Sequence, residues 1–348
     1  MKPAASKHAH KKRLNLALQG GGSHGAFTWG VLHRIMEDGR LFIDGISGAS
    51  AGALNGVVFA DGFLKGKRQG AIEALGEFWR SVSQHSPFTH SVMRSVATPM
   101  GKVNLDDTPL FQMFDATSRL FSPYQFNPFN INPLKAVLEE HVDFGALRRH
   151  KEIRLFIAAT NVHKCKSRLF RTPEITVDTV LASTCLPMLY QAVEIEGEHY
   201  WDGGYLGNPA IYPLIHECPS NDVLIVMINP LRRKGVPDTA REILNRVTEI
   251  SFNASLISEM RNFTAITKLI ESGELKSRRY ARVNFHLIEP PEELADYSAS
   301  SKFNADWDFL RYLHDLGWEA ADKWLKRHYA AIGKNSSLDV YKRFLDHD

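Results

Sequence analysis

The chain has 348 residues, of which 44% are hydrophobic and 23% are charged, a composition near the globular average that argues against a disordered or fibrous protein. The formal net charge is only +3, and no stretch combines a long lysine and arginine run with stacking aromatic residues, so we expect no nucleic-acid partner. Cys165, Cys185 and Cys218 are odd in number and widely spaced, which disfavours a disulfide framework and favours a reducing compartment.

The amino terminus, MKPAASKHAHKKR, is basic but leads into no long apolar segment, because glycine follows the six residues LNLALQ. A secretory signal is therefore not expected. No stretch approaches the roughly 18 apolar residues of a membrane-spanning helix. We predict that residues 1–13 are a flexible tail of a cytoplasmic protein, with peripheral contact at the inner membrane face as the alternative for this basic segment.

The first seventy residues repeat one pattern twice. Residues 14–18 have the composition of a buried strand, and a glycine turn and an apolar pattern with helical spacing over 26–35 follow it. Residues 41–47 indicate a second short strand, and after the turn GASAG residues 51–63 indicate a second helix. Because two strand–turn–helix units follow each other so closely, we predict a parallel sheet with right-handed crossovers.

The pattern loosens between residues 66 and 134. A helix is expected near 71–81, but SPFTHSVMRSVATPMG and LFSPYQFNPFNINP are rich in proline, asparagine, serine and aromatic residues, which predicts little regular structure. We interpret 66–134 as an insertion or lid whose apolar side chains contact the acyl chain or belong to the core. These side chains are Phe88, Met93, Phe121, Tyr124, Phe126 and Phe129.

Regular elements return in the rest of the chain. Their order predicts an α/β protein, a three-layer α/β/α sandwich with a mostly parallel central sheet. We expect residues 14–290 to form one domain and residues 291–348 to be a helical extension packed on it. Helices are predicted at 134–142, 179–186, 241–270 and 306–331, strands at 153–162, 222–228 and 282–290, and a loop at HYWDGGYLGNP, residues 199–209.

The run GASAG, residues 48–52, places Ser50 between a predicted strand and a predicted helix. This is the setting of a nucleophile elbow, in which a serine hydroxyl projects from a strained turn and the flanking glycines, Gly48 and Gly52, relieve crowding. The start of a helix also favours negative charge on a reacting oxygen. The alternative is an ordinary turn with Ser50 as the N-cap.

The glycine-rich loop GGGSHG, residues 20–25, follows the first predicted strand. If strands 14–18 and 42–46 lie side by side, this loop and the elbow emerge at the same carboxyl edge of the sheet, where open α/β folds bind ligands. The backbone N–H groups of Gly21 and Gly22 would then face a carbonyl group attacked by Ser50. This arrangement predicts an oxyanion hole.

A dinucleotide site is the rival interpretation of the same loop. Gly20, Gly22 and Gly25 satisfy G-x-G-x-x-G, and Asp44 follows nineteen residues later, as in a dinucleotide-binding oxidoreductase. This rival leaves GASAG without a role. It also does not explain Asp202, a carboxylate followed by two glycines, whereas an activated serine needs a base.

Four stretches, in this order, resemble the patatin-like phospholipase family. They are GGGSHG (20–25), GASAG (48–52), ASTCLP (182–187) and DGG (202–204), the last followed by an Asn-Pro pair. The motifs extend over about residues 14–230, which is most of the chain, whereas the segment beyond about 235 carries no comparable motif. Four ordered motifs favour this family over the dinucleotide interpretation.

The resemblance implies a catalytic dyad in which Ser50 is the nucleophile and Asp202 is the general base. It also implies an oxyanion hole formed by the loop backbone, which we assign to Gly20, Gly21, Gly22 and Ser23. The supporting glycines are Gly25, Gly48, Gly52, Gly203 and Gly204. A carboxylate with a reference pKa near 3.9 is a weak base for a serine hydroxyl, so burial of Asp202 or strong stabilisation of the developing charge must compensate.

One position departs from the commonest family pattern, in which lysine or arginine stands before the last glycine of the loop. This chain has His24 there, which either contributes charge when protonated, caps the helix or is an exposed first-turn side chain. A Ser-His-Asp triad is the competing hydrolase arrangement. Its histidine would be His216, His286 or His314, which all follow Asp202.

We therefore predict a serine acyl hydrolase of phospholipase A or lysophospholipase type that cleaves fatty acyl esters of lipids without a cofactor or metal. The alternatives are a non-catalytic lipid-binding or regulatory protein on the same fold and a dinucleotide-binding oxidoreductase. The residues leave the identity of the ester, the acyl position and the oligomeric state open.

Overall fold

The computed structural model describes residues 12–86, 104–106, 108–233, 235–275, 282–292, 294 and 297–346. The two predicted strand–turn–helix units are present: β1 (Lys12–Leu18) pairs in parallel with β2 (Leu41–Gly48), and α1 (Gly25–Asp38) and α2 (Ala51–His85) follow them. α2 is kinked at Gly66 and Lys67, so the two helices predicted on either side are halves of one element. β1 begins at Lys12, two residues before the predicted start of the strand at residue 14.

The described residues form an eight-stranded sheet in the order β5-β6-β3-β2-β1-β7-β8, with β4 paired to β3 off this path. Neighbours from β3 to β8 along this order are parallel, whereas β4, β5 and β6 add antiparallel pairs. The predicted mostly parallel sheet is thus confirmed. The remaining strands are β3 (Arg154–Asn161), β4 (Lys166–Arg171), β5 (Val193–Ile195), β6 (Glu198–Asp202), β7 (Asp222–Val226) and β8 (Asn284–Ile288).

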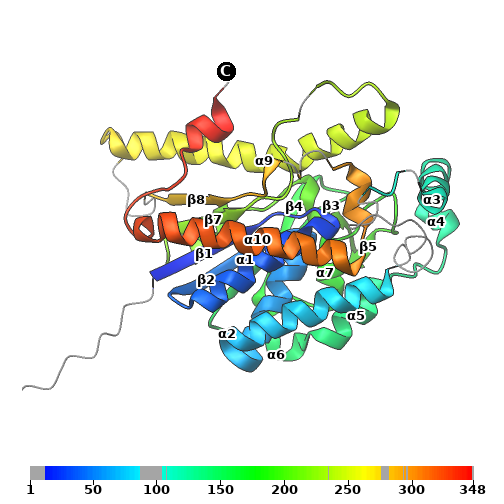
Figure 1. Ribbon diagram of the computed structural model, residues 1–348, viewed down its shortest axis with the longest axis horizontal. Coiled ribbons are helices and arrows are strands. Elements are labelled where there is room, and N and C mark those ends of the chain that lie inside the picture. Colours follow the sequence, from blue (N-terminus) through cyan, green and yellow to red (C-terminus); the bar gives the residue numbers. More distant parts are fainter. Residues whose placement is uncertain are drawn as a thin grey trace, which may run out of the picture.

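Helices cover both faces of the sheet and bury alternate strand residues. Leu16 and Leu18 pack into a core with α1, α2 and α10 (Trp307–His328), whereas Ala17 faces a second core with α8 (Tyr212–Glu217) and α9 (Ala240–Glu271). Figure 1 shows α10 beside α1 on one side of the strands and α9 on the other. This alternation produces the predicted three layers, because successive side chains of a strand point to opposite faces.

Several elements differ from the sequence prediction. The segment predicted as a loop at 199–209 begins with β6, because Asp202 pairs with Ala159 of β3. β4 was not predicted, since its sequence KSRLFR is strongly charged. α3 (Pro109–Leu120) lies in the region expected to lack regular structure, as do the short α4 (Pro123–Phe126) and the bend at 127–132. Phe88 and Met93 of the predicted lid lie outside the described residues.

The carboxyl-terminal helix α10 packs closely on α1. A Cβ atom added to Gly30 of α1 would lie 1.8 Å from the His314 carbonyl oxygen, and one added to Gly317 of α10 would lie 2.0 Å from the Phe27 carbonyl oxygen. The two glycines therefore let the helix backbones approach each other. The other helices are α5 (Pro133–His141), α6 (Phe144–Arg148) and α7 (Val177–Ser183). Within the described ranges, no helix is both long and apolar enough to cross a membrane.

Candidate active site

Ser50 lies in a sharp turn between β2 and α2. Its φ of 52° and ψ of −126° are in a region that costs a non-glycine residue about 1–3 kcal/mol and is found where the surrounding structure imposes it. The turn is held by hydrogen bonds: the Gly52 N–H donates to the Ala49 carbonyl at 2.8 Å, and the Ser50 N–H donates to Ser183 Oγ at 3.0 Å. Ser50 therefore has the backbone strain predicted for an elbow.

Close backbone contacts bring the glycine loop and the elbow together, as predicted. A Cβ atom on Gly52 would lie 2.1 Å from the Leu18 carbonyl oxygen, and a Cβ atom on Gly20 would lie 2.6 Å from the Cβ of Ser50. Neither space accommodates a side chain. The other predicted glycines have similarly close neighbours, namely Gly25 against Ala51, Gly48 against Gly52, Gly203 against Ala158 and Gly204 against Phe252.

Asp202 ends β6, and β6 is joined to the β2 elbow through β3. Its N–H donates to the Cys185 carbonyl at 2.8 Å, and its Oδ1 accepts from the Gly204 N–H at 2.7 Å. The side chain is fully buried, and no described residue completes a hydrogen bond to the second carboxyl oxygen, Oδ2. Oδ2 of Asp202 can therefore accept a hydrogen bond from a further donor.

Burial raises the pKa of Asp202 to about 7, against the opposing effects of the Gly204 N–H and of a side-chain hydrogen bond from Ser50. The Ser50 hydroxyl thus favours the ionised form of the carboxyl group, although no described residue completes a hydrogen bond to Oδ2. Catalytic hydrogen bonds are often poorly aligned before substrate binds. A base with a pKa near neutrality is a better match for a serine hydroxyl than an ordinary aspartate, although stabilisation of the developing charge is still needed.

The glycine loop offers fewer free amides than predicted. The Gly20 N–H donates to Asn208 Oδ1 at 2.6 Å, so Gly20 is not available as an oxyanion donor and this prediction is corrected. No described residue accepts a hydrogen bond from the amide of Gly21 or Gly22. Gly22 has a φ of +59°, which a glycine adopts without strain, and begins the short 3-10 helix η1 (Gly22–His24) with Ser23 in its first turn.

His24 is buried rather than exposed in the first turn. Its Nε2 is 2.8 Å from the Ser301 hydroxyl oxygen. Burial, together with the nearby charges of Lys302 and Arg233, lowers the pKa of His24 to about 3. The imidazole is therefore neutral at physiological pH and supplies no positive charge where the commonest family pattern has lysine or arginine.

The histidines considered for a triad lie elsewhere. His286 is bonded to Asp222 and Ser337, at 3.0 and 2.8 Å. His314 is bonded to His33 and Asp315 at the α1–α10 contact, and His216 lies in α8. No described histidine is hydrogen-bonded to Ser50 or Asp202, so the structure does not form the competing triad.

The residue expected to bind a ribose in the dinucleotide interpretation is also engaged. Asp44 lies in the middle of β2 and is 2% exposed. The Arg13 Nε–H donates to its Oδ2 at 2.9 Å, and a second guanidinium nitrogen contacts Oδ1. A buried carboxylate with an arginine partner does not offer its oxygens to a ribose, so the dinucleotide interpretation fails at this residue.

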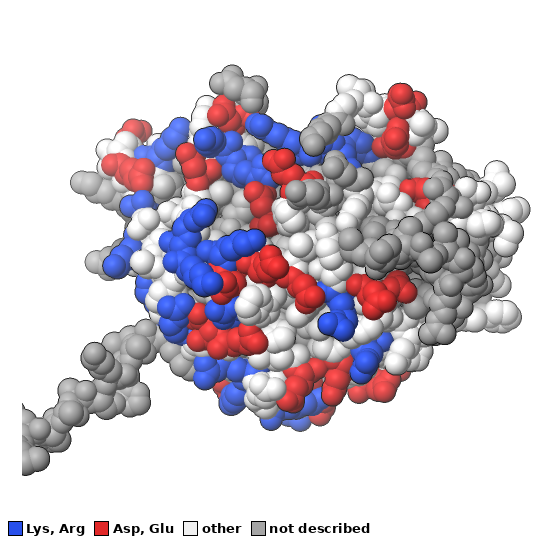
Figure 2. Space-filling view, in the orientation of Figure 1, with Lys and Arg blue, Asp and Glu red and all other residues white. Residues whose placement is uncertain are grey.

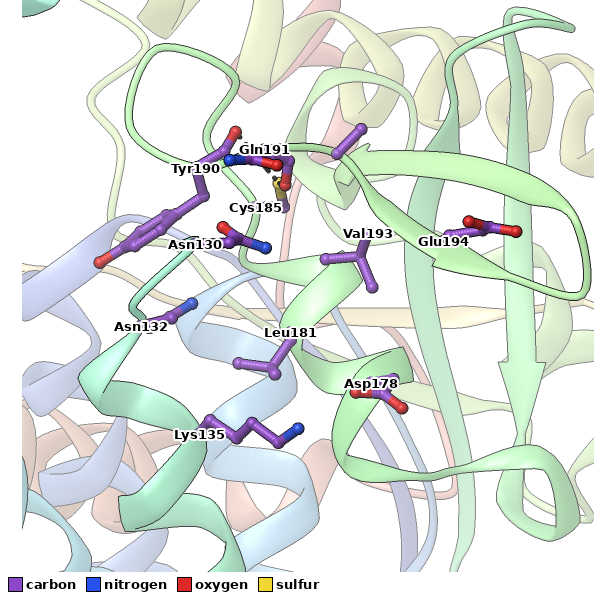
Figure 3. A pocket seen from close by; sticks show the side chains of 11 residues that line it. Asn130, Asn132, Lys135, Asp178, Leu181, Cys185, Tyr190, Gln191, Val193 and Glu194 are labelled. Carbon is purple, nitrogen blue, oxygen red and sulfur yellow. Dashed lines mark hydrogen bonds between the residues drawn. The ribbon is translucent and has the colours of Figure 1, made fainter. Parts of the chain in front are cut away.

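A cavity of about 320 Å³ adjoins the Asp202 side of the site (Figure 3). Cys185 connects the two, because its carbonyl accepts the Asp202 N–H and its thiol donates to the Gln191 carbonyl at 3.2 Å. Burial raises the pKa of Cys185 to about 12, so it remains a thiol. The lining residues are Asn130, Asn132, Lys135, Asp178, Leu181, Cys185, Tyr190, Gln191, Ala192, Val193 and Glu194.

Sequence reasoning missed the polar side chains that hold the loop and the elbow in place. Gln19 Oε1 accepts from the Ile228 and Asn229 amides at 2.8 Å each, and Asn229 Nδ2 donates to the Gly20 carbonyl at 2.6 Å. Asn208 and Ser183 act on Gly20 and Ser50 as described above. Asn208 and Asn229 follow elements that end at the carboxyl edge of the sheet, which is the signal that points to them.

Three comparisons place these observations among known proteins. The family model described as "Patatin-like phospholipase" matches residues 16–215. VipD from Legionella pneumophila is 14% identical, with a TM-score of 0.39 over 90% of this chain and 67% of that chain. ExoU in its heterodimer with SpcU from Pseudomonas aeruginosa is 15% identical, with a TM-score of 0.36 over 92% of this chain and 52%, about half, of that chain. No curated protein sequence matches the chain.

Proposed function

Because the chain belongs to the patatin-like phospholipase family, which supports lipid acyl hydrolysis, we propose that Ser50 is its nucleophile and Asp202 its general base. The observation that carries this proposal is the fully buried Asp202 carboxyl group, which has one oxygen that no described residue completes a hydrogen bond to, together with the strained Ser50 elbow. Burial raises the pKa of Asp202 to about 7, which suits a general base. Ser50 lies in the turn that follows β2, and Asp202 is the last residue of β6 in the same sheet.

In the proposed reaction, the Asp202 carboxylate accepts the hydroxyl proton while Ser50 Oγ attacks the ester carbonyl carbon. The resulting oxyanion accepts hydrogen bonds from the Gly21 and Gly22 amides, with the Ser23 amide as a further candidate. The tetrahedral intermediate expels the alcohol, which takes the proton from Asp202. Water then attacks acyl-Ser50, with Asp202 again as base, and the fatty acid leaves as Ser50 regains its proton.

The N-termini of α1 and α2 both favour the negative charge that develops on the substrate oxygen next to Ser50. The elbow leads directly into α2, and the glycine loop leads through η1 into α1. Both helix N-termini therefore begin at the carboxyl edge of the sheet. Unpaired N–H groups and the positive end of the helix dipole stabilise an anion there, which lowers the barrier to the tetrahedral intermediate.

We propose that lipid is approached through the α3–α4 end of the molecule. Figure 1 shows these helices at the end toward which the parallel strands run, and Figure 2 shows mostly uncharged side chains there in the face in view. Phe121 and Tyr124 of the predicted contact surface are 51% and 57% exposed. The exposed apolar side chains of this region are Met113, Leu120, Phe121, Tyr124, Phe129, Ile131 and Met188.

This apolar segment is linked to the wall of the cavity. The Ala192 N–H donates to the Tyr124 hydroxyl at 3.3 Å, and Gln191 Nε2 donates to the Asn127 carbonyl at 2.9 Å. The strap 185–192 therefore joins the exposed side chains to Asp202 through Cys185. The exposed apolar side chains favour a fatty acyl ester presented from a lipid surface. We propose a phospholipid or lysophospholipid as this ester because the chain belongs to the patatin-like phospholipase family.

The proposed function is tested by exposing a mixed membrane lipid extract to the wild type and to Ser50→Ala and identifying the products by mass spectrometry. We expect free fatty acids and lysolipids with the wild type alone. Ser337→Ala is the matched control, because it removes a serine hydroxyl from the opposite edge of the sheet. Equal product formation by the wild type and Ser50→Ala would overturn the assignment.

A further inference from the structure

The glycine loop is supported by a part of the chain that lies outside residues 16–215. The 3-10 helix η6 (Ala299–Phe303) packs against η1, and a Cβ atom on Gly22 would lie 2.4 Å from the Lys302 carbonyl oxygen. Ser301, the neighbouring residue, holds His24. The carboxyl-terminal region therefore forms one wall of the loop that we propose as the oxyanion hole.

Lys302 is connected to this loop through one asparagine. Its Nζ donates to Asn229 Oδ1 at 2.7 Å, and Asn229 Nδ2 donates to the Gly20 carbonyl at 2.6 Å. The Gly20 carbonyl and the Gly21 N–H belong to the same peptide group. A donor on the carbonyl polarises this group, and a positive charge behind the donor strengthens the effect, because linked hydrogen bonds in a medium of low dielectric reinforce one another.

On the basis of the proposed hydrolase function, we propose that Lys302 is a positioning residue of the oxyanion hole, which acts through Asn229 to orient the Gly20–Gly21 peptide and strengthen the Gly21 N–H as a donor. This is a role for positive charge that does not require contact with the substrate. It makes the carboxyl-terminal region part of the catalytic machinery.

The surrounding charges favour this role over an ordinary ion pair. Glu249, the carboxylate that acts on Lys302, is held by the Arg233 Nε–H at 2.8 Å and by Arg246 at 3.3 Å. No described carboxylate forms an ion pair with Lys302. The ammonium group instead donates to a neutral amide that leads to the loop.

The charge of Lys302 is sensitive to pH near neutrality. Burial lowers its pKa to about 8, Glu249 raises the pKa and Arg233 lowers it further. His24, which faces the same region from η1, is neutral, and Arg246 remains charged beside Glu249. The ammonium is therefore present below about pH 8 and is lost above it. The proposal therefore predicts that kcat declines above about pH 8 because Lys302 loses its positive charge.

Three substitutions separate charge, hydrogen bonding and packing. Lys302→Met keeps most of the side-chain volume, Lys302→Gln keeps a neutral N–H donor, and Lys302→Arg keeps the charge above pH 8. With a soluble p-nitrophenyl acyl ester, we expect kcat to fall roughly tenfold in the Met and Gln variants with little change in KM. This is less than the ~10²- to 10³-fold loss that follows removal of a whole oxyanion donor.

Lys302→Arg is expected to recover most of kcat and to move the alkaline decline to higher pH. Lys323→Met removes an exposed lysine of α10 and is the matched control, with no expected change in kcat. Circular dichroism and thermal unfolding of each variant show whether it is folded. Unchanged kcat and an unchanged alkaline decline in folded Lys302→Met and Lys302→Gln would overturn the proposal.

A second measurement is independent of turnover. In the Ser50→Ala background, the amide proton resonance of Gly21 is expected to move upfield when Lys302→Met is added, because the amide becomes less polarised. An unmoved resonance would also overturn the relay. Absence of Ser50-dependent hydrolysis in the wild type would instead refute the proposed function, and the Gly21 resonance would still decide whether Lys302 acts on this peptide.

Discussion

Two serine and carboxylate constellations lie at opposite edges of the same sheet, and they differ in what their polar atoms are bonded to. At the carboxyl edge, Ser50 lies against the glycine loop, and Asp202 ends the neighbouring strand β6. At the amino edge, where β7 and β8 begin, His286 Nε2 lies 3.0 Å from Asp222 Oδ1, and His286 Nδ1 lies 2.8 Å from the Ser337 hydroxyl oxygen. By residue type, the second constellation resembles a catalytic triad more closely than the first.

In the second constellation, Asp222 Oδ1 and both ring nitrogens of His286 are hydrogen-bonded to neighbouring groups of the protein. Asp222 Oδ1 also accepts from the Gly333 N–H at 2.8 Å and from Asn284 Nδ2 at 3.3 Å, and His286 is fully buried. These bonds connect the carboxyl-terminal segment to the sheet. At the first constellation, by contrast, the serine backbone is strained. Among the described residues, none completes a hydrogen bond to Asp202 Oδ2 or accepts one from the Gly21 or Gly22 amide. We infer from this comparison that a reactive site is indicated by polar atoms that lack hydrogen-bond partners, and not by the residue types alone.

The largest difference in kcat between the two constellations is expected when the serine hydroxyl of each is removed. Ser50→Ala is expected to lower kcat by at least about 10³-fold, because it removes the proposed nucleophile. Ser337→Ala is expected to leave kcat unchanged, because its hydroxyl only bonds His286. Steady-state hydrolysis of a p-nitrophenyl acyl ester measures both. A large loss of kcat in Ser337→Ala and none in Ser50→Ala would place the active site at the amino edge and contradict the proposal.

Removal of each carboxylate gives the next largest difference. Asp202→Asn is expected to lower kcat by roughly 10²- to 10⁴-fold, the usual contribution of a general base. In the wild type, kcat should rise as pH increases through about 7, since Asp202 must be ionised to accept the proton. Asp222→Asn is the matched control, and its kcat should remain near that of the wild type. If kcat of Asp202→Asn still rises as pH increases through about 7, a group other than Asp202 causes this rise.

The same two carboxylates have opposite effects on stability. The pKa of Asp202 is higher in the folded protein, about 7, than in the unfolded chain, so its stabilising contribution is present below about pH 4 and is lost as pH rises through 7. Asp202→Asn should therefore become more stable relative to the wild type as pH rises over this range. Asp222→Asn weakens three hydrogen bonds and should be less stable. Urea unfolding at pH 5 and pH 8 measures both.

A smaller effect is expected from a methyl group in the glycine loop. Gly22→Ala places a Cβ atom 2.4 Å from the Lys302 carbonyl at a φ of +59°, so the loop must shift and kcat should fall roughly tenfold. Gly273→Ala is the matched control, because Gly273 has a φ of +78° and open space around it. A kcat as high in Gly22→Ala as in Gly273→Ala would show that loop geometry does not limit the reaction.

The smallest effect on catalysis is expected from His286→Ala. This change leaves the Ser50 site intact, so kcat should not change measurably. The free energy of unfolding should fall by roughly 1–3 kcal/mol, because one buried and one partly buried hydrogen bond of the imidazole are lost together with its packing. Urea unfolding and ester hydrolysis on one preparation test the pair of outcomes. Loss of activity without loss of stability would indicate a chemical role for the amino edge.

The elements around the proposed active site were not equally predictable from sequence. Glycine patterns and apolar runs predicted β1, β2, the elbow and its meeting with the glycine loop, because the constraints there are local and steric. β6 was missed because a strand of only five residues followed by glycines resembles a loop until its pairing with β3 is known. His24 was left open because its burial depends on η6, nearly three hundred residues away.

The supporting polar groups were the least predictable. Asn229 and Lys302 belong to segments with no diagnostic motif, and their roles depend on which carbonyl and amide the tertiary fold places beside them. The same holds for the commitment of the Gly20 amide to Asn208, which corrects the predicted donor set. Motifs thus indicate where chemistry is placed, whereas the hydrogen-bond partners of each backbone group emerge only from the fold.

Covalent labelling with a fluorophosphonate, followed by mass spectrometry of the peptides, tests the central contrast most directly, because such a reagent captures an activated serine. We predict a single adduct on Ser50, formed at least ~100-fold more slowly in Asp202→Asn, and no adduct on Ser337. An adduct on Ser337, or an unmodified Ser50 after prolonged exposure of the folded wild type, would contradict the account.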